Sequence, residues 1–217
     1  SPLQSKKCMN LINTFLNKNK ILLEIGSGYS TIDFSNKVKE ICSIEHNITW
    51  YNNISNLIKK YNIKNINYIL VEPNMDVITK KSVKYNLDLG LGGGGGKYWE
   101  YDMYSKYIEQ IGKFNSNFDI CFIDGQARMH CYLYVYNYLN NDGIVIIHDF
   151  YNIPDRDLLD KLWNFKILFK YYDKIESIEK IGKNNNRGND VIILKKKNNI
   201  KFDINDMYLL DKNIPRY

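Results

Sequence analysis

Five short runs of apolar residues recur along the chain, and each is separated from the next by a stretch with helical periodicity. Strands that are apolar throughout are buried on both faces, which is typical of a parallel sheet covered by helices. The predicted strands are Ile21–Ile25, Ile41–Glu45, Asn67–Val71, Phe118–Ile123 and Gly143–His148. This alternation predicts an α/β fold with a doubly wound, mostly parallel, Rossmann-like sheet.

Helical periodicity fills the intervals between these strands, and the pattern changes near the end of the chain. We expect helices over residues 8–15, 49–60, 99–112, 128–139 and 156–165. Residues 168–178 and 191–195 flank a polar turn at 182–189, which predicts a C-terminal antiparallel hairpin that closes the sheet. At 217 residues, the whole chain, 1–217, is expected to form one domain.

One stretch interrupts the alternation. Residues 88–97 hold six of the 13 glycines, five of them consecutive. Such a run is too flexible to cradle a ligand, and it lacks the Lys-Ser/Thr ending of a phosphate-binding loop. We expect a flexible insertion between the third strand and the next helix.

The charge balance, taken alone, favours a nucleic-acid partner. The net charge is +6, but lysines outnumber arginines 26 to 4, and the abundant Lys, Asn, Ile and Tyr all have AT-rich codons. Genome composition therefore accounts for the charge, and a nucleic-acid partner is not expected from it.

Other features of the composition bear on where the protein works. The cysteines at positions 8, 42, 121 and 131 show no metal-binding spacing, so reduced thiols are expected. No apolar run approaches the roughly 20 residues of a membrane span, and a signal-peptide pattern is missing. We expect a cytoplasmic protein with no membrane partner. Because the chain opens on Ser1 without an initiator Met, it is compatible with a piece of a longer protein.

The most informative motif lies between the first strand and the following helix. Residues 24–31 read Glu-Ile-Gly-Ser-Gly-Tyr-Ser-Thr. Glycines at 26 and 28 permit a tight turn and close approach of a ligand to the backbone. A helix that begins near Ser30, with Asp33 completing a capping box, would present free N–H groups. The acid at Glu24 would repel a pyrophosphate but can meet an ammonium group.

A second acid, Glu45, ends the second strand, where a carboxylate can accept hydrogen bonds from ribose hydroxyls. Together these residues resemble the first two motifs of the class I S-adenosylmethionine-dependent methyltransferases, and the order of strands and helices matches that fold over most of the chain. The resemblance implies S-adenosylmethionine as cofactor. It places the cofactor against Glu24, Gly26, Ser27, Gly28, Ser30, Thr31, Glu45 and Asp124.

Two further motifs follow the fourth and fifth strands. Residues 122–128 read Phe-Ile-Asp-Gly-Gln-Ala-Arg, and residues 146–150 read Ile-Ile-His-Asp-Phe. Since the carboxyl ends of parallel strands meet at one edge of a sheet, we expect Asp124, Arg128, His148 and Asp149 to lie together. With Arg156, these motifs resemble a family of polysaccharide and sugar O-methyltransferases that includes the glucuronoxylan 4-O-methyltransferases. The resemblance implies a sugar or nucleotide-sugar acceptor.

Methyl transfer to a hydroxyl needs a group that takes the hydroxyl proton. His148 is the expected base, because it is the one of three histidines at a strand end beside an acid. Asp149 can orient His148, join Asp124 on Mg²⁺, or act as the base itself; Asp124 can also cap the next helix. The motifs also resemble metal-assisted small-molecule O-methyltransferases, except that His148 replaces a second acid and Ala127-Arg128 replaces a histidine.

The acceptor is expected to meet arginine and aromatic side chains. Arg128 and Arg156 can hold a diphosphate or a uronate carboxylate, and Tyr101, Tyr104 and Tyr132 can stack on sugar rings. Two alternatives stay open. One is a methyltransferase for RNA ribose or an RNA cap, and the other is a non-catalytic module of this fold within a polysaccharide-assembly enzyme.

Overall fold

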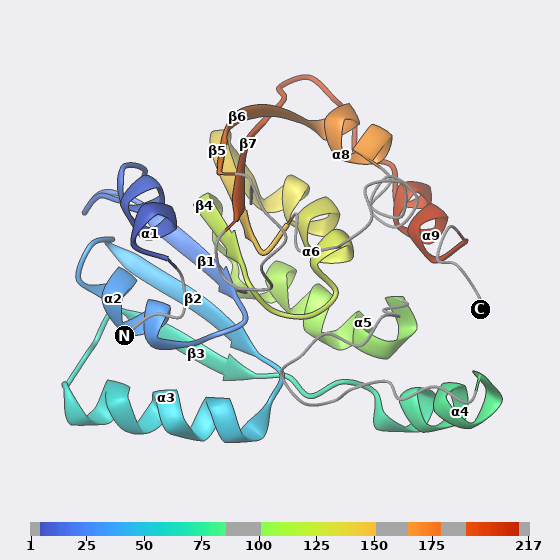
Figure 1. The fold of residues 1–217 in the computed structure, drawn as a ribbon, viewed down its shortest axis with the longest axis horizontal. Helices are drawn as coiled ribbons and strands as arrows, with labels where there is room; N and C mark the ends of the chain where they lie inside the picture. The colour runs from blue at the N-terminus through green and yellow to red at the C-terminus, as the bar shows by residue number, and fades with distance from the viewer. Residues whose placement is uncertain (1–4, 86–100, 151–164, 179–189, 213–217) are drawn as a thin grey trace.

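The computed structural model describes residues 5–85, 101–150, 165–178 and 190–212, and Figure 1 shows how their elements are arranged. Seven strands of these residues form one sheet: β1 (Ile21–Ile25), β2 (Glu40–Glu45), β3 (Ile66–Leu70), β4 (Phe118–Ile123), β5 (Leu139–His148), β6 (Tyr172–Ile178) and β7 (Val191–Lys196). The described α-helices are α1 (Lys6–Asn13), α2 (Tyr29–Ser35), α3 (Ile48–Lys60), α4 (Met75–Tyr85), α5 (Tyr101–Glu109), α6 (Arg128–Val135), α8 (Phe165–Tyr171) and α9 (Asn205–Lys212). Two 3₁₀ turns, η1 (Gln110–Phe114) and η2 (Tyr136–Tyr138), follow α5 and α6.

The strand order is β3-β2-β1-β4-β5-β7-β6. Strands β1 to β5 pair in parallel, and β7 lies antiparallel between β5 and β6. This arrangement confirms the predicted fold class, a mostly parallel sheet with an antiparallel C-terminal pair. The chain order reverses between β1 and β4, and open α/β sheets bind ligands beyond the carboxyl ends of the strands at such a point. The fold therefore brings the turn after β1 next to the motif after β4.

Helices cover both faces of the sheet, and the strands alternate their side chains between the two cores. On one face, Leu22 and Phe122 pack with Cys8 and Ile12 of α1 and with Phe34 of α2. The neighbouring residues along the same strands point to the other face, where they pack with buried side chains of α5, α6, α8 and α9. This two-sided burial is why the strands are uniformly apolar.

The predicted secondary structure is wrong for the apolar run near residue 170. Residues 168–171 were expected to begin a strand, but they belong to α8, and β6 begins at Tyr172. Leu168 and Tyr171 lie one helical turn apart and are both fully buried, so a helix buries these apolar side chains on one of its faces. A short apolar run does not by itself distinguish a buried helix from a strand. Helices α4 and α9 were not predicted.

Several expectations fall on parts of the chain outside the described residues. They are the insertion at 88–97, most of the helix at 156–165, and the polar turn at 182–189. Within the described ranges, no helix combines the length and hydropathy that a membrane crossing requires. The four cysteines are buried and free, as expected.

Candidate functional site

Two loops meet back to back where the chain order reverses. Gly26 has a φ of +87°, and a Cβ built there would lie 2.4 Å from Cα and N of Gly125. A Cβ on Gly125 would in turn lie 2.4 Å from the hydroxyl oxygen of Tyr107 and 3.0 Å from Gly26 Cα. Only glycine fits at both positions, and the backbone contact fixes the turn after β1 against the loop after β4.

The Glu24 carboxylate lies fully buried beneath the turn. Ser30, Thr31 and Ser43 donate their hydroxyls to it at 2.9, 2.6 and 2.7 Å. Burial raises the pKa of Glu24 to about 7, against the opposing effect of the three hydrogen bonds. Glu24 therefore holds the turn in shape, and because it is fully buried among the described residues, the predicted contact with an ammonium group is not available in this arrangement.

The capping box differs from the predicted one. Gly28 is the N-cap of α2, and its N–H donates to Thr31 Oγ1 at 3.1 Å, so Thr31 takes the role predicted for Asp33. Asp33 instead pairs with Lys37 at 2.5 Å. The predicted cap, Ser30, is already engaged because its hydroxyl bonds to the buried carboxylate under the turn.

The second glycine of the turn is not required by its conformation. Gly28 has an extended φ of −171°, which any residue can adopt. Among the described residues, a Cβ built there would touch only Ser30 Oγ, at 3.7 Å. The described part of the chain therefore leaves room beside the backbone of Gly28, which fits a ligand lying directly against the turn, as S-adenosylmethionine would.

Glu45, at the end of β2, is almost fully buried. Ser27 donates its N–H and its hydroxyl to Oε2 at 2.8 and 2.9 Å, while the N–H groups of His46 and Asn47 donate to Oε1 at 2.9 and 2.8 Å. Burial raises the pKa of Glu45, but the hydrogen bonds and the charge of His46 outweigh it, so the net pKa is lowered. Glu45 is thus an ionised anchor for the turn. The Tyr68 hydroxyl, 2.6 Å from Ser27 Oγ, extends this network to β3.

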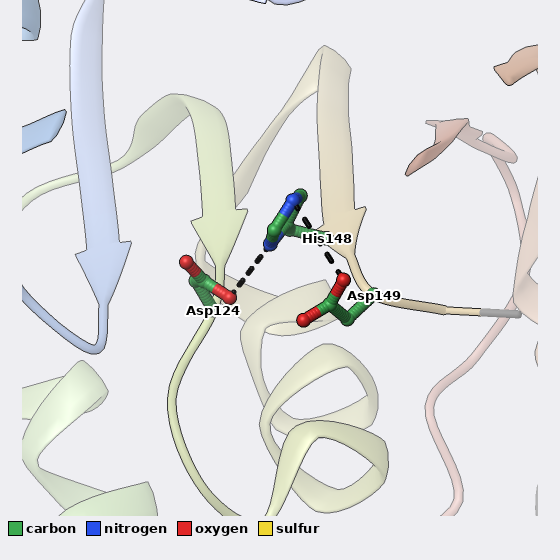
Figure 2. Close-up of side chains that lie close together, drawn as sticks. All are labelled: Asp124, His148 and Asp149. Atoms are coloured by element: carbon green, nitrogen blue, oxygen red, sulfur yellow. Dashed lines mark hydrogen bonds and ion pairs between the residues drawn. The ribbon is translucent and has the colours of Figure 1, made fainter. Parts of the chain in front are cut away.

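Three polar side chains gather where β4 and β5 end, as Figure 2 shows. Asp124 Oδ1 lies 2.9 Å from His148 Nδ1, and Asp149 Oδ1 lies 3.8 Å from His148 Nε2. Because an ionised Asp124 can only accept, Nδ1 carries the ring proton, which leaves Nε2 with a lone pair. Nε2 makes no hydrogen bond with the described residues. The backbone of Asp149 is left-handed, with φ at +53°, and its N–H donates to the Asp190 carbonyl at 3.1 Å.

The two acids set the protonation of His148. Burial lowers the pKa of this histidine, but the charge and hydrogen bond of Asp124 and the charge of Asp149 raise it, and the net pKa is above the ordinary value of 6.5. The ring therefore takes up a proton more readily than a free imidazole, and the imidazolium that results is stabilised by two neighbouring carboxylates.

Arg128, the first residue of α6, lies between the same two strand ends. Its Nε donates to the Gly125 carbonyl at 2.9 Å, Nη1 donates to the His148 carbonyl, and Nη2 donates to the Asp124 carbonyl at 3.3 Å. Nη2 also lies 3.5 Å from the Asp124 carboxylate. All three guanidinium nitrogens thus have partners within the protein. Binding of an anionic substrate by Arg128 stays a prediction, and it would compete with these contacts.

The Asp124, His148 and Asp149 side chains could also hold a cation. One ligand atom from each lies within 4.8 Å of the others, and two carboxylates with an imidazole suit a divalent ion. The residues therefore fit the predicted metal site of Asp124 and Asp149, with His148 as a third ligand.

The predicted sugar-stacking tyrosines are mostly in the core. Tyr132 of α6 is fully buried, and Tyr104 of α5 is 5% exposed, so neither offers a ring face to a sugar. Tyr101 is partly exposed, but its hydroxyl donates to Glu109 at 2.7 Å. Arg156 lies outside the described residues.

Sequence reasoning missed three residues that shape the site. Ser43 is a small polar residue between apolar neighbours in the middle of β2, which is a signal that a buried partner exists. Gly125 stood in the motif without a role, and Tyr68 was one of 18 tyrosines with nothing to distinguish it. Their partners lie in other strands, so spacing along the chain could not identify them.

No protein-family model matches the chain, and no curated protein matches it. Solved structures do share its fold. An O-methyltransferase from Bacillus cereus in complex with SAH (S-adenosylhomocysteine) aligns with a TM-score of 0.59 at 15% identity, over 91% of this chain and 82% of that one. An rRNA methylase from Streptococcus thermophilus aligns with a TM-score of 0.56 at 12% identity, over 90% and 99%. Precorrin 8W decarboxylase from Methanobacterium thermoautotrophicum aligns with a TM-score of 0.53 at 13% identity, over 91% and 92%.

At these identities the comparisons establish the fold alone, which is the Rossmann-like fold of class I methyltransferases. The three solved structures are of an O-methyltransferase, an rRNA methylase and a decarboxylase, so one architecture serves different reactions. The reaction of this chain has to be inferred from its own side chains.

Proposed function

We propose that this protein is an S-adenosylmethionine-dependent O-methyltransferase whose acceptor is a sugar hydroxyl, in a nucleotide-sugar or a glycan. The observation that carries the proposal is the direct contact between the glycine turn after β1 and the loop that holds Asp124 beside His148. A ligand on the turn would lie close to the loop that carries Asp124, whose partner His148 has a buried Nε2 with no hydrogen bond among the described residues. The SAH complex of an O-methyltransferase with this fold supports the choice of cofactor.

The residues of the turn would bind the cofactor. Gly28 lets it approach the backbone, and the network of Ser27 and Glu45 would meet its ribose hydroxyls, which would share or displace the Ser27 hydroxyl. S-adenosylmethionine, when bound, supplies a methyl group on a positively charged sulfur. Glu24 holds the turn in shape from beneath through its three hydroxyl partners.

His148 would act as the general base. Its Nε2, which is buried among the described residues, would have to be reached by the acceptor hydroxyl. It would then accept the hydroxyl proton as the oxygen takes the methyl group and S-adenosylhomocysteine leaves. Asp124 keeps the other ring nitrogen protonated, so that Nε2 is the basic atom, and stabilises the imidazolium that forms. A bound divalent cation would be an alternative to this arrangement: Asp124, His148 and Asp149 would be its ligands, the lone pair of the ring would be taken by the ion, and the ion would polarise the hydroxyl in place of the base.

The sugar acceptor rests on the motifs at residues 122–128 and 146–150, which resemble those of sugar O-methyltransferases. RNA is the second candidate, favoured by the net charge of +6 and by the likeness to an rRNA methylase. The two acceptors differ in their salt dependence, because phosphate contacts release counterions and an RNA affinity falls steeply with salt.

Two measurements test the proposal. Calorimetry with S-adenosylhomocysteine should show binding, and its absence at millimolar ligand would leave only the non-catalytic alternative. Incubation with a methyl donor and a panel of nucleotide-sugars, oligosaccharides and RNA oligomers, read by mass spectrometry, should show methylated sugar with His148 present and none with His148→Gln. Methylation of RNA alone would replace the sugar proposal, and EDTA in the same assay tests the cation.

A further inference from the structure

We propose that Arg128 is a positioning residue that clamps the ends of β4 and β5 and so holds His148 against Asp124. The kinetic effects expected for Arg128 rest on the proposed function, whereas its role in holding His148 against Asp124 does not depend on that function. It differs from the role expected from the sequence, in which the guanidinium would bind an anionic acceptor.

The clamp lies where the ladder between β4 and β5 ends, although His148 is still paired with Val191 of β7. The parallel ladder between β4 and β5 ends with the pair Ile123 and Ile147. Asp124 and His148 come one residue later, beyond the last ladder pair, so the 2.9 Å distance between their side chains is not set by strand pairing between β4 and β5. The Asp124 N–H donates to the Ile25 carbonyl of β1 at 2.9 Å and His148 pairs with Val191 of β7, so each strand end is held by its other neighbour, and a side chain is needed to join the two ends directly.

Arg128 supplies that connection. It bonds to two carbonyls of the β4 loop, at Asp124 and Gly125, and to the carbonyl of His148 at the end of β5. A planar guanidinium donates in fixed directions, so three carbonyls on two strand ends are held in one arrangement. A lysine could carry the same charge but could not reproduce this fork.

The backbone around the clamp is itself constrained. Ala127, just before the arginine, has a φ of +49°, and Asp149, just after the histidine, has a φ of +53°. Non-glycine residues keep such conformations only where their surroundings impose them. The hydrogen bonds of Arg128 to the adjoining carbonyls are part of that constraint, and the side chain is only 17% exposed.

Catalysis is sensitive to this kind of placement, since a displacement of about 1 Å between reacting groups can cost roughly a hundredfold in rate. We expect Arg128→Lys to lower kcat at least tenfold while the acceptor KM and the dissociation constant of S-adenosylhomocysteine change less than threefold. Arg128→Met should do the same to a greater extent. The matched control is Lys195→Met, which removes a positive charge paired with Asp142 at the far end of β5 and should leave both parameters unchanged.

Nitrogen-15 NMR of the histidine rings provides a readout that needs neither substrate nor activity. The chain has three histidines, and a His148→Gln spectrum identifies the signals of this ring. The wild-type protein should show His148 with its proton on Nδ1, and both Arg128 variants should show a mixture of the two ring tautomers. An unchanged tautomer in both variants would disprove the clamp.

The kinetic outcomes separate this proposal from its alternatives. A large rise in acceptor KM at constant kcat would make Arg128 a substrate ligand and overturn the clamp. If the wild-type protein neither binds S-adenosylhomocysteine nor methylates any acceptor, the proposed function fails, and the NMR measurement still decides whether Arg128 sets the geometry.

Discussion

Two regions of the same sheet edge use carboxylates in opposite ways. In the turn region, which comprises residues 24–31 with Ser43 and Glu45, both acids have their oxygens bonded to hydroxyl and N–H groups of the chain. In the strand-end region, which comprises residues 124–128 with His148 and Asp149, a histidine nitrogen has no hydrogen bond to the described residues. In the turn region the acids are engaged in hydrogen bonds that hold the loop in shape. In the strand-end region, His148 Nε2 keeps a lone pair that can accept a proton.

The largest expected effect comes from the glycine that joins the two regions. Gly26→Ala would place a methyl group 2.4 Å from Gly125 backbone atoms at a φ of +87°. We expect the free energy of unfolding to fall by about 3 kcal/mol or more, as measured by urea denaturation, since both clash and backbone strain oppose the folded state. A variant as stable as the wild type would show that the two loops can separate freely.

Gly28→Ala is the matched control, because its added methyl group has room and its φ suits any residue. Its stability should stay within about 0.5 kcal/mol of the wild type. Its affinity for S-adenosylhomocysteine should nevertheless fall at least tenfold by calorimetry, because the methyl group would enter the space assigned to the ligand. Unchanged affinity would place the ligand elsewhere.

Substituting the histidine should affect turnover and leave the turn region intact. We expect His148→Gln to reduce kcat on the order of a hundredfold or more, since no base remains to accept the hydroxyl proton. The dissociation constant of S-adenosylhomocysteine should stay close to that of the wild type. Retained turnover would move the proton transfer to another group, and Asp149 would be the next to test.

The buried acid of the turn region should make stability depend on pH. The pKa of Glu24 is raised from 4.5 to about 7, so the folded protein keeps this proton over a range in which the unfolded chain has lost it. Stability from this group is therefore complete below about pH 4.5, falls as the pH rises to about 7, and is level above that. Relative to Glu24→Gln, the wild type should lose roughly 2 to 3 kcal/mol across this range in urea titrations. Parallel pH profiles for the two proteins would contradict the shift.

The smallest expected effect is on the pH dependence of activity. The pKa of His148 is raised chiefly by Asp124 against the opposing effect of burial, and the protonated ring is not a base, so activity should fall as the pH drops through this raised value. Asp124→Asn can still accept from Nδ1 but carries no charge. The acidic limb of its kcat profile should therefore move to lower pH. A limb that stays in place would assign it to another group.

The strands, the glycine turn and the acids at strand ends were predictable because each depends on residues close together in the sequence. Ile21–Ile25 and Phe118–Ile123 were predicted with the boundaries they have in the structure. Parallel pairing then places the strand ends at one edge, which is why Asp124, His148 and Asp149 were expected together. The strand boundaries and the parallel pairing were therefore enough to predict that Asp124, His148 and Asp149 lie together.

The partners of those residues could not be predicted in the same way. Whether Glu24 faces a ligand or three hydroxyls depends on Ser43 in the neighbouring strand, and whether Arg128 meets a substrate or the His148 carbonyl depends on the spacing of β4 and β5. The sequence alone determined the fold class and which chemical groups reach the edge of the sheet. The tertiary structure decided which of these groups form hydrogen bonds that hold the site together. Such a bond depends on distances between strands, and these distances cannot be derived from spacing along the chain.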